Sequence, residues 1–344
     1  MRPPAPTEAA VNPERHDSAE KSWGWRVACF VACLPSGASL LAKLYGIASL
    51  RTGAIVVVLP CCLGLFGVWL WARRSRRQWL ATLLTIGFFG GLLGTFGYDL
   101  VRVPAHLGGQ RIFAPISTYG VWIAEADASS RFTDVLGWSY HLSNGITFGL
   151  MYALLLRGRA WGWAVLWALI LETIAFLSPF VRLFTLSGAA VFNAYLAHVA
   201  YGVPLGLVVQ RGEDTLRYLA RVPVAFKWMA AALCCAALAA PLLVPGNVRR
   251  DGRAKAGEFR IEGHELNPDW LRIERGTAIR IYNPSPADDS VVVRKSGRNE
   301  LVPVASQSRR LVTFDKPGIH RLFVATRGRT RSSFVIAEPV EEVD

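Results

Sequence analysis

Three ionisable side chains stand inside long apolar stretches of this sequence. They are His141, Glu172 and His198. Burying such groups in a membrane segment is costly, so they mark either functional sites or polar contacts between helices. Two imidazoles and a carboxylate can ligate a divalent metal ion. The same groups can pass protons, because histidine titrates near neutrality and burial raises the pKa of a carboxyl towards that range.

The two histidines share a local pattern. Residues 141–149 and residues 198–206 both read His-x3-Gly-x3-Gly. On a helix this spacing puts each histidine in line with two glycines, so another helix or a planar ligand can approach that face closely. A duplicated structural unit and a chance match between glycine-rich helices both remain open as explanations.

A second polar group lies at the end of the apolar stretch 79–101. Asp99 and Arg102 are three positions apart and can pair on a helix, with Tyr98 and His106 nearby. The predicted metal ligands are His141, His198, Glu172, Asp99 and His106. A transition metal, or a haem held between the two motif histidines, is the predicted cofactor. A proton or solute pathway through the same side chains and separate hydrogen bonds between helices are the alternatives.

Seven apolar segments are predicted to position these groups, because a bilayer core needs about 20 apolar residues in a helix. The first is interrupted by Pro35 and by Lys43, whose long stem can reach the membrane interface. The long connection 102–133 contains several aromatic residues and is predicted to pack as a lid or to lie in the interface. The predicted spans are 24–48, 53–72, 79–101, 134–156, 161–180, 188–209 and 226–245.

Basic residues predict the orientation of these spans, since short cytoplasmic loops are rich in Lys and Arg. The loop 73–77 contains four arginines, and Arg157, Arg159 and the basic residues of 211–227 fall on the same side when the spans alternate. A multi-pass protein of the cytoplasmic membrane is therefore expected, with its N-terminus inside. The net charge of +13 is largely explained by these clusters and by the C-terminal region, which argues against a nucleic-acid partner.

Composition divides the chain into three parts. Residues 1–22 are rich in Pro and charge and are predicted to be a disordered cytoplasmic tail. Residues 23–246 form the predicted membrane domain in contact with the lipid bilayer, and residues 247–344 form a water-exposed, extracytoplasmic domain. The six cysteines lie in apolar segments, so no disulfide framework is predicted. Cys29 and Cys33 share one helix face and are interpreted as packing residues, with a soft-metal site as the alternative.

The C-terminal part alternates apolar and polar residues over short stretches separated by turn residues. This pattern is typical of an all-β Greek-key sandwich. The predicted strands are 258–261, 271–274, 278–282, 290–294, 310–314, 320–325 and 333–337.

The stretches 271–283 and 314–324, the second containing the turn Pro317-Gly318, resemble the cupredoxin family. In that family a strand ends in Asn before the first copper histidine, and a Pro-Gly turn leads into the strand that carries the copper cysteine. This sequence has Asp289 at the first position and Val324 at the second. A type-1 copper centre needs two histidines and a thiolate. The resemblance therefore implies a cupredoxin-like domain that binds no type-1 copper.

The remaining histidines of this domain, His264 and His320, are interpreted as structural. The region that would form the ligand loop is instead basic, which predicts an anionic or protein partner, or lipid head groups. A solvated strand-and-turn face is the alternative. The predicted partner-binding residues are Arg321, Arg327, Arg329 and Arg331.

No nucleotide-binding loop, zinc-protease motif or nucleophile elbow occurs in the sequence. Three hypotheses about function follow. The first is a metal-handling or redox membrane protein with its site in the helical bundle beneath the outer domain. The second is a proton-coupled transporter of a small solute that uses the same side chains. The third is a non-catalytic assembly factor whose β-domain docks a partner.

Overall fold

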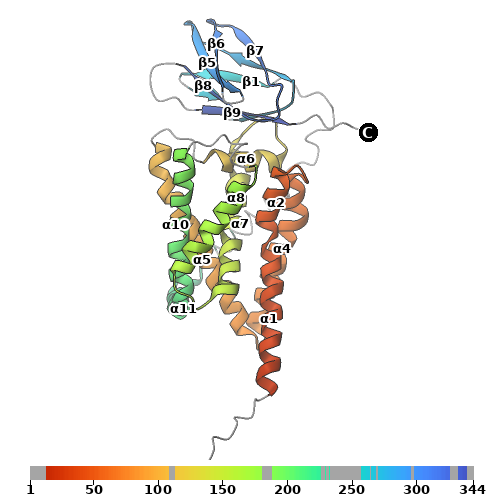
Figure 1. The fold of residues 1–344 in the computed structure, drawn as a ribbon, viewed down its shortest axis with the longest axis vertical. Coiled ribbons are helices and arrows are strands. Elements are labelled where there is room, and N and C mark those ends of the chain that lie inside the picture. Colours follow the sequence, from red (N-terminus) through yellow and green to blue (C-terminus); the bar gives the residue numbers. More distant parts are fainter. Residues whose placement is uncertain are drawn as a thin grey trace, which may run out of the picture.

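The structure is a computed structural model. It describes residues 13–107, 113–179, 188–225, 229 and 232, and then 257–325 and 332–338 except for 264, 269 and 296–297. A helical bundle stands below a β-domain (Figure 1). The helices are α1 Pro13–Cys33, α2 Pro35–Leu44, α3 Leu50–Thr52, the π-helix η1 Gly53–Val58, α4 Leu59–Arg74, α5 Gln78–Leu107, α6 Ala114–Ala124, α7 Arg131–Leu156, α8 Gly162–Leu177, α10 Gly188–Gln210 and α11 Gly212–Arg221.

Four helical stretches of the described chain are long and apolar enough to cross a membrane. They are Trp23–Leu44, Leu50–Arg74, Gln78–Ala105 and Gly188–Gln210, and the shorter helix Gly162–Leu177 is also apolar. The predicted membrane-embedded helical part is thus supported, whereas the predicted count of seven spans is not confirmed. The predicted span 134–156 corresponds to α7, which is long but carries many polar side chains that face its neighbours. The predicted span 226–245 lies largely outside the described residues.

The first predicted span consists of two helices that meet at Leu34. Pro35 occupies the first turn of α2, where its missing N–H costs no hydrogen bond. Helix α1 begins at Pro13, within the segment predicted to be a disordered tail. A lone proline thus divides the span without ending the helical run.

The connection 102–133 is more regular than expected. Helix α5 continues to Leu107, and α6 packs against α7. A Cβ on Gly137 would overlap the carbonyl of Ile116, so the two helices touch backbone to backbone. Ser130 caps α7 together with Thr133, which fixes where this helix begins.

Nine described strands form two sheets in the β-domain. A four-stranded sheet has the order β2-β1-β4-β7, and a five-stranded sheet has the order β3-β9-β8-β5-β6. The bounds are β1 Glu258–Glu262, β2 Glu265–Asn267, β3 Trp270–Glu274, β4 Ala278–Tyr282, β5 Asp289–Lys295, β6 Arg298–Val304, β7 Arg309–Thr313, β8 Gly318–Val324 and β9 Ser332–Glu338.

The prediction of a plain Greek-key sandwich is corrected by the strand directions. Strand β1 pairs parallel with β4, and β3 pairs parallel with β9, while the other pairs are antiparallel. Both sheets of the domain are therefore mixed. All seven predicted strands are present, and β2 and β6 were missed. Alternation of side chains predicts a strand but says nothing of the direction of its neighbour.

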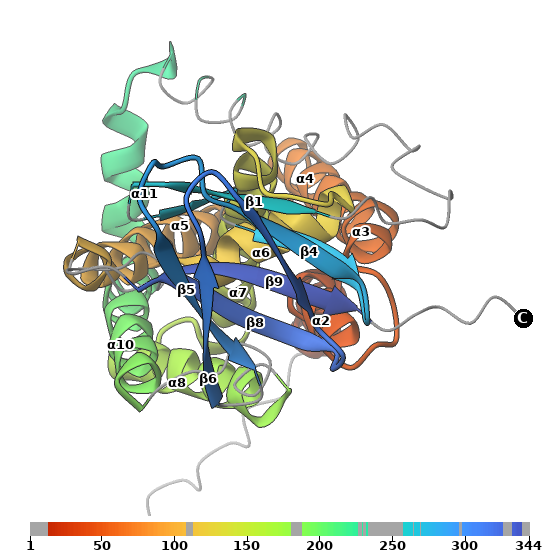
Figure 2. The same ribbon diagram turned by 90° about the horizontal axis from the view of Figure 1, so that it is seen from above.

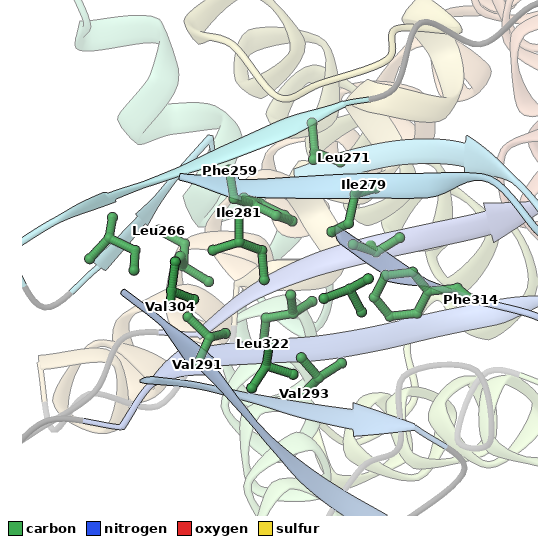
Figure 3. Packing of buried hydrophobic residues seen from close by; sticks show 14 of the residues in the cluster. Phe259, Leu266, Leu271, Ile279, Ile281, Val291, Val293, Val304, Phe314 and Leu322 are labelled. Atoms are coloured by element: carbon green, nitrogen blue, oxygen red, sulfur yellow. The ribbon is translucent and has the colours of Figure 1, made fainter. Parts of the chain in front are cut away.

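Apolar side chains from both sheets meet in one core (Figure 3). Phe259, Ile279 and Ile281 of the four-stranded sheet are buried against Leu322 and Val293 of the other. Burial of this kind is the main driving force for folding the domain, at about 25 cal/mol per Å² of apolar surface.

The β-domain rests on the bundle through a second apolar cluster. Trp270 of β3 stacks on Phe334 of β9 with ring centroids 4.4 Å apart. Both belong to the same buried cluster as Leu50, Tyr119 and other bundle residues. Strands β8 and β9 lie over α2 and α7 when the molecule is seen from above (Figure 2).

Main-chain bonds reinforce this contact at the start of α7. The N–H of Ser129 donates to the carbonyl of Trp270 (3.0 Å), and the N–H of Arg272 donates to the carbonyl of Asp127 (2.6 Å). The linker before α7 therefore pairs with β3 like a short extra strand.

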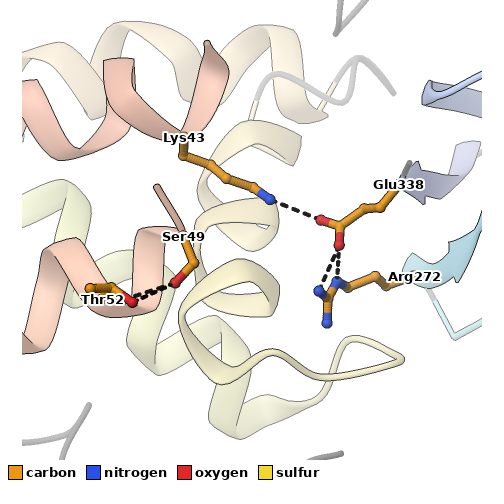
Figure 4. Close-up of polar contacts among 5 residues, drawn as sticks. All are labelled: Lys43, Ser49, Thr52, Arg272 and Glu338. Atoms are coloured by element: carbon orange, nitrogen blue, oxygen red, sulfur yellow. Dashed lines mark hydrogen bonds and ion pairs between the residues drawn. The ribbon is translucent and has the colours of Figure 1, made fainter. Parts of the chain in front are cut away.

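Glu338 joins the two parts by an ion pair with Lys43 and is also paired with Arg272 of its own domain (Figure 4). One carboxylate oxygen accepts a bond from Nζ of Lys43 on α2 (2.9 Å), and the other accepts two bonds from the Arg272 guanidinium (2.8 and 2.6 Å). Burial by itself raises the pKa of Glu338, but the two cations outweigh it and hold that pKa below the ordinary value of 4.5. Lys43, which interrupts the first apolar segment, is thus a docking residue.

Replacing Glu338 by Gln should lower the free energy of unfolding by about 1–2 kcal/mol, because the ion pair with Lys43 between the two domains and the ion pair with Arg272 within the β-domain are both lost. A depressed carboxyl pKa contributes stability above about pH 4.5 that is lost as the pH falls further. Thermal unfolding of the full chain in detergent should therefore show a smaller acid destabilisation in the variant. The control is Glu262→Gln, whose partner Arg260 lies 3.9 Å away in an exposed pair. Equal acid sensitivity of wild type and Glu338→Gln would contradict the prediction.

Candidate functional site

Glycines let α5 and α7 touch along their backbones. A Cβ on Gly91 of α5 would lie 2.6 Å from the carbonyl oxygen of Gly145, and a Cβ on Gly149 of α7 would overlap the main chain of Gly91. Gly145 and Gly149 are the two glycines of the first His-x3-Gly-x3-Gly motif. The contact brings the face that carries His141 against α5.

The second motif acts in the same way on a different helix. A Cβ on Gly202 of α10 would lie 2.5 Å from the Cα of Val165, and one on Gly206 would lie 2.5 Å from the carbonyl oxygen of Trp161. Both positions face the start of α8. The other side of α10 packs on α5, where Gly97 lies against the carbonyl of Ala200.

Each histidine meets a carboxylate on the helix that its glycines approach. Nε2 of His141 lies 3.0 Å from Oδ1 and 3.2 Å from Oδ2 of Asp99, on α5. Nε2 of His198 lies 3.4 Å from Oε2 of Glu172, on α8. All four side chains are at least four-fifths buried. The three ionisable groups first singled out, together with Asp99, therefore form two His–carboxylate pairs.

The hydrogen bonds of His198 define its protonation. Nδ1 lies 3.0 Å from the carbonyl oxygen of Ala194 and must donate to it, because a carbonyl accepts only. In a neutral imidazole Nε2 then carries no proton and can only accept a hydrogen bond. It repels an ionised Glu172 carboxylate and can accept a hydrogen bond from a protonated Glu172 carboxyl. A hydrogen bond across this 3.4 Å contact would therefore need one proton, carried either by His198 or by Glu172.

Tyr98 of α5 links the two pairs. Its ring centroid lies 5.6 Å from that of His141 and 4.9 Å from that of His198. The guanidinium of Arg102, one turn further along α5, lies 4.8 Å from the Tyr98 ring and 4.9 Å from the Phe113 ring. Cation–π contacts of this kind help a buried guanidinium to stay charged. A haem ligated by both histidines would have to displace the Tyr98 ring.

The predicted metal ligands are only partly brought together. Among the described residues no group of three or more His, Cys, Asp or Glu side chains could hold a metal ion. His106 lies on α5, and its side chain is outside the described part. Metal or haem binding through the predicted set stays a prediction. The Asp99 carboxylate lies 3.0 Å from Nε2 of His141, and its predicted pairing with Arg102 stays a prediction.

A groove opens beside the first pair, on the flank of the bundle between α5 and α7. Its volume is about 380 Å³. Polar atoms come from Asp99, Asp134 and His141, and the walls are largely apolar. The complete lining is Thr95, Phe96, Asp99, Asp134, Val135, Trp138, Ser139, His141 and Leu142.

Two side chains of this region had no functional signal in the sequence. Asp134 lies in the first turn of α7, where an acidic residue is explained by the favourable interaction of a negative charge with the helix N-terminus. Tyr201 donates a hydrogen bond to the carbonyl of Gly145 (2.6 Å) and so ties α10 to α7. Neither role could be assigned without knowing which helices are neighbours.

In the β-domain, the two positions that carry copper ligands in cupredoxins have other roles. Val324 is buried in the core, and the Asp289 carboxylate accepts a bond from the N–H of Ser290 (2.7 Å). Nε2–H of His320 donates to the carbonyl of Lys316 (2.9 Å), and burial lowers the pKa of this histidine. His264 lies outside the described residues.

The predicted basic partner surface is described only at its first residue. Nε of Arg321 on β8 donates to the hydroxyl of Ser332 (2.5 Å). Arg327, Arg329 and Arg331 lie outside the described part of the chain. The predicted anionic or protein partner of this surface therefore stays a prediction.

Comparison with known proteins yields one likeness of fold. No family model matches the chain, and no curated protein matches its sequence. The solved structure of amicyanin from Paracoccus versutus (Thiobacillus versutus) is 21% identical over 26% of this chain and 86% of amicyanin, with a TM-score of 0.21. A Cu(I) form of an amicyanin mutant is 13% identical over 26% of this chain and 87% of its own, with a TM-score of 0.23. These likenesses assign no ligand, activity or partner to this chain.

Replacing Gly202 by Ala should destabilise the bundle by about 1–3 kcal/mol, because the added methyl meets the main chain of α8 and cannot be accommodated by a side-chain shift. The measurement is thermal unfolding of the purified protein in detergent. Gly64→Ala on α4 is the matched control, since a Cβ there has nothing within 4 Å and Ala favours a helix. A Gly202→Ala variant as stable as wild type would show that the backbone contact is not needed.

Proposed function

We propose that this chain is a proton-coupled transporter of a small solute in the cytoplasmic membrane. Its N-terminus is cytoplasmic and its β-domain is extracytoplasmic, as the basic loop 73–77 favours. The proton-exchange site consists of the two His–carboxylate pairs, Asp99–His141 and Glu172–His198. The observation that carries the proposal is that both pairs contact one side chain, Tyr98.

Proton exchange requires a group that is stable with and without a proton. The Glu172–His198 pair meets this condition, since one proton can reside on the carboxylate or on Nε2 without a change of partner. Imidazole and carboxyl side chains are the usual members of proton relays inside membranes. Two such pairs on four different helices supply two protonation sites that small helix movements can join or separate.

Helix geometry supports the coupling of these pairs to movement. α5 contributes Asp99 and Tyr98 and contacts both α7 and α10 through glycines. A displacement of α10 relative to α5 would change the Tyr98–His198 contact while the Asp99–His141 pair stays on the other face. The fixed backbone contacts and the titrating pairs therefore lie at the same helix interfaces.

The arrangement favours transport over the other hypotheses. The described residues show two separate His–carboxylate pairs, and proton exchange uses each pair as it stands. An assembly role would give no function to the four buried ionisable side chains of the two His–carboxylate pairs, although each is costly to bury. Transport makes direct use of all four.

The Glu172→Gln variant tests the proposal, because the amide keeps the shape but cannot exchange a proton. In lipid vesicles with a trapped pH-sensitive dye, wild-type protein should move protons when members of a panel of small amines, anions and sugars are added outside. The variant should lose this movement by more than about tenfold, which corresponds to about 1.4 kcal/mol. Infrared spectroscopy of both proteins in lipid should show a titrating carboxyl band in wild type that is missing in Glu172→Gln.

The matched control is Glu262→Gln, an exposed position of the β-domain that should leave both signals unchanged. Correct folding of Glu172→Gln is checked by its thermal unfolding. A folded Glu172→Gln variant that still moves protons at the wild-type rate would overturn the proposal.

A further inference from the structure

The groove between α5 and α7 is open to the surroundings of the bundle. Its walls include Phe96, Val135 and Trp138, whose exposed fractions are 61%, 54% and 41%. Large apolar side chains on the flank of a membrane bundle face acyl chains. A ligand can therefore enter this groove sideways from the lipid.

The polar groups of the groove are arranged along its length. Asp134 lies in the first turn of α7, next to the β-domain, and its Oδ1 accepts a bond from the hydroxyl of Ser117 (3.1 Å). His141 is seven residues further along the helix, which is about 10 Å at 1.5 Å per residue. The groove thus runs from the end of the bundle near the β-domain towards the proton-exchange pairs.

Charge and shape select the class of ligand. Two acidic residues, Asp99 and Asp134, are among the residues that line the groove, and so is Trp138. Carboxylates beside aromatic faces are the chemistry that recognises organic ammonium groups. Phe96, Val135 and Leu142 provide apolar surface for a hydrocarbon chain.

We infer that this groove binds the ammonium head group of a single-chain or lipid amphiphile that enters from the bilayer. The inference deepens the proposed function and rests on it, because it names the substrate class that the Asp99–His141 pair would serve. The head group lies between Asp134 and Asp99, and the alkyl chain follows the exposed apolar wall into the membrane.

Equilibrium binding to the full chain in nanodiscs of digalactosyl diacylglycerol, a lipid without an ammonium group, tests the inference, with radiolabelled dodecylammonium as the probe. Wild type should bind one saturable equivalent. Asp134→Asn and the groove-filling Val135→Trp should each weaken binding at least about tenfold. The matched control is Ile170→Trp, on the exposed face of α8, which should bind as wild type does.

Two further measurements are needed. The first distinguishes the possible sources of the ligand, and the second distinguishes a failure of this inference from a failure of the transporter proposal. Competition by phosphatidylethanolamine in the nanodisc would identify a membrane lipid as a source of the head group, whereas competition by free alkylamines alone would identify a soluble amphiphile. Glu172→Gln should keep binding while losing proton movement, because Glu172 does not line the groove. Proton movement without any saturable dodecylammonium binding would overturn the inference and leave the transporter proposal intact.

The inference requires that binding depends on the positive charge of the ligand. Equal binding of dodecanol, or full binding in Val135→Trp, would show that the groove only holds hydrocarbon and would overturn the inference. Thermal unfolding of Asp134→Asn and Val135→Trp verifies that each is folded, so that a loss of binding is a property of the groove.

Discussion

The close approach of α5 to its two neighbours is the contact on which the rest of the bundle depends. Helices in a membrane gain no hydrophobic stabilisation from contact with one another, since lipid is as apolar as leucine. They associate through tight packing and polar bonds. The glycines of α5, α7 and α10 remove the side chains that would hold the backbones apart. This lets short side chains such as Asp99 reach a partner on the next helix.

Close packing and buried charge support each other at this site. Each motif histidine lies on the same helix face as its two glycines, so the helix that approaches the glycines also brings the carboxylate. A wider spacing between the helices would leave the imidazole and the carboxylate unpaired in an apolar medium, which is costly. The glycine contact is therefore a condition for having titratable groups in the bundle at all.

Much of this could be predicted from sequence, and the parts that could not have a common cause. Apolar length predicted the helical membrane part, and alternation predicted most strands, because both are local properties. The spacing of His141, His198 and their glycines predicted polar faces that pack closely. The partner of each histidine depended on which helices are neighbours, so the contact between His141 and Asp99 could not be predicted. The parallel pairs β1–β4 and β3–β9 were missed for the same reason.

The β-domain and the Asp99–His141 pair are connected through the start of α7. The linker residues Asp127 and Ser129 bond to β3, and α7 begins directly after them with the Ser130 cap. Asp134 follows within the first turn, and His141 lies two turns below it. Because a helix transmits a displacement along its axis as a nearly rigid rod, movement of the β-domain on the Trp270 cluster would shift Asp134 and His141 of α7 relative to Asp99 of α5. The Glu338–Lys43 ion pair ties that domain to α2 and so limits this movement.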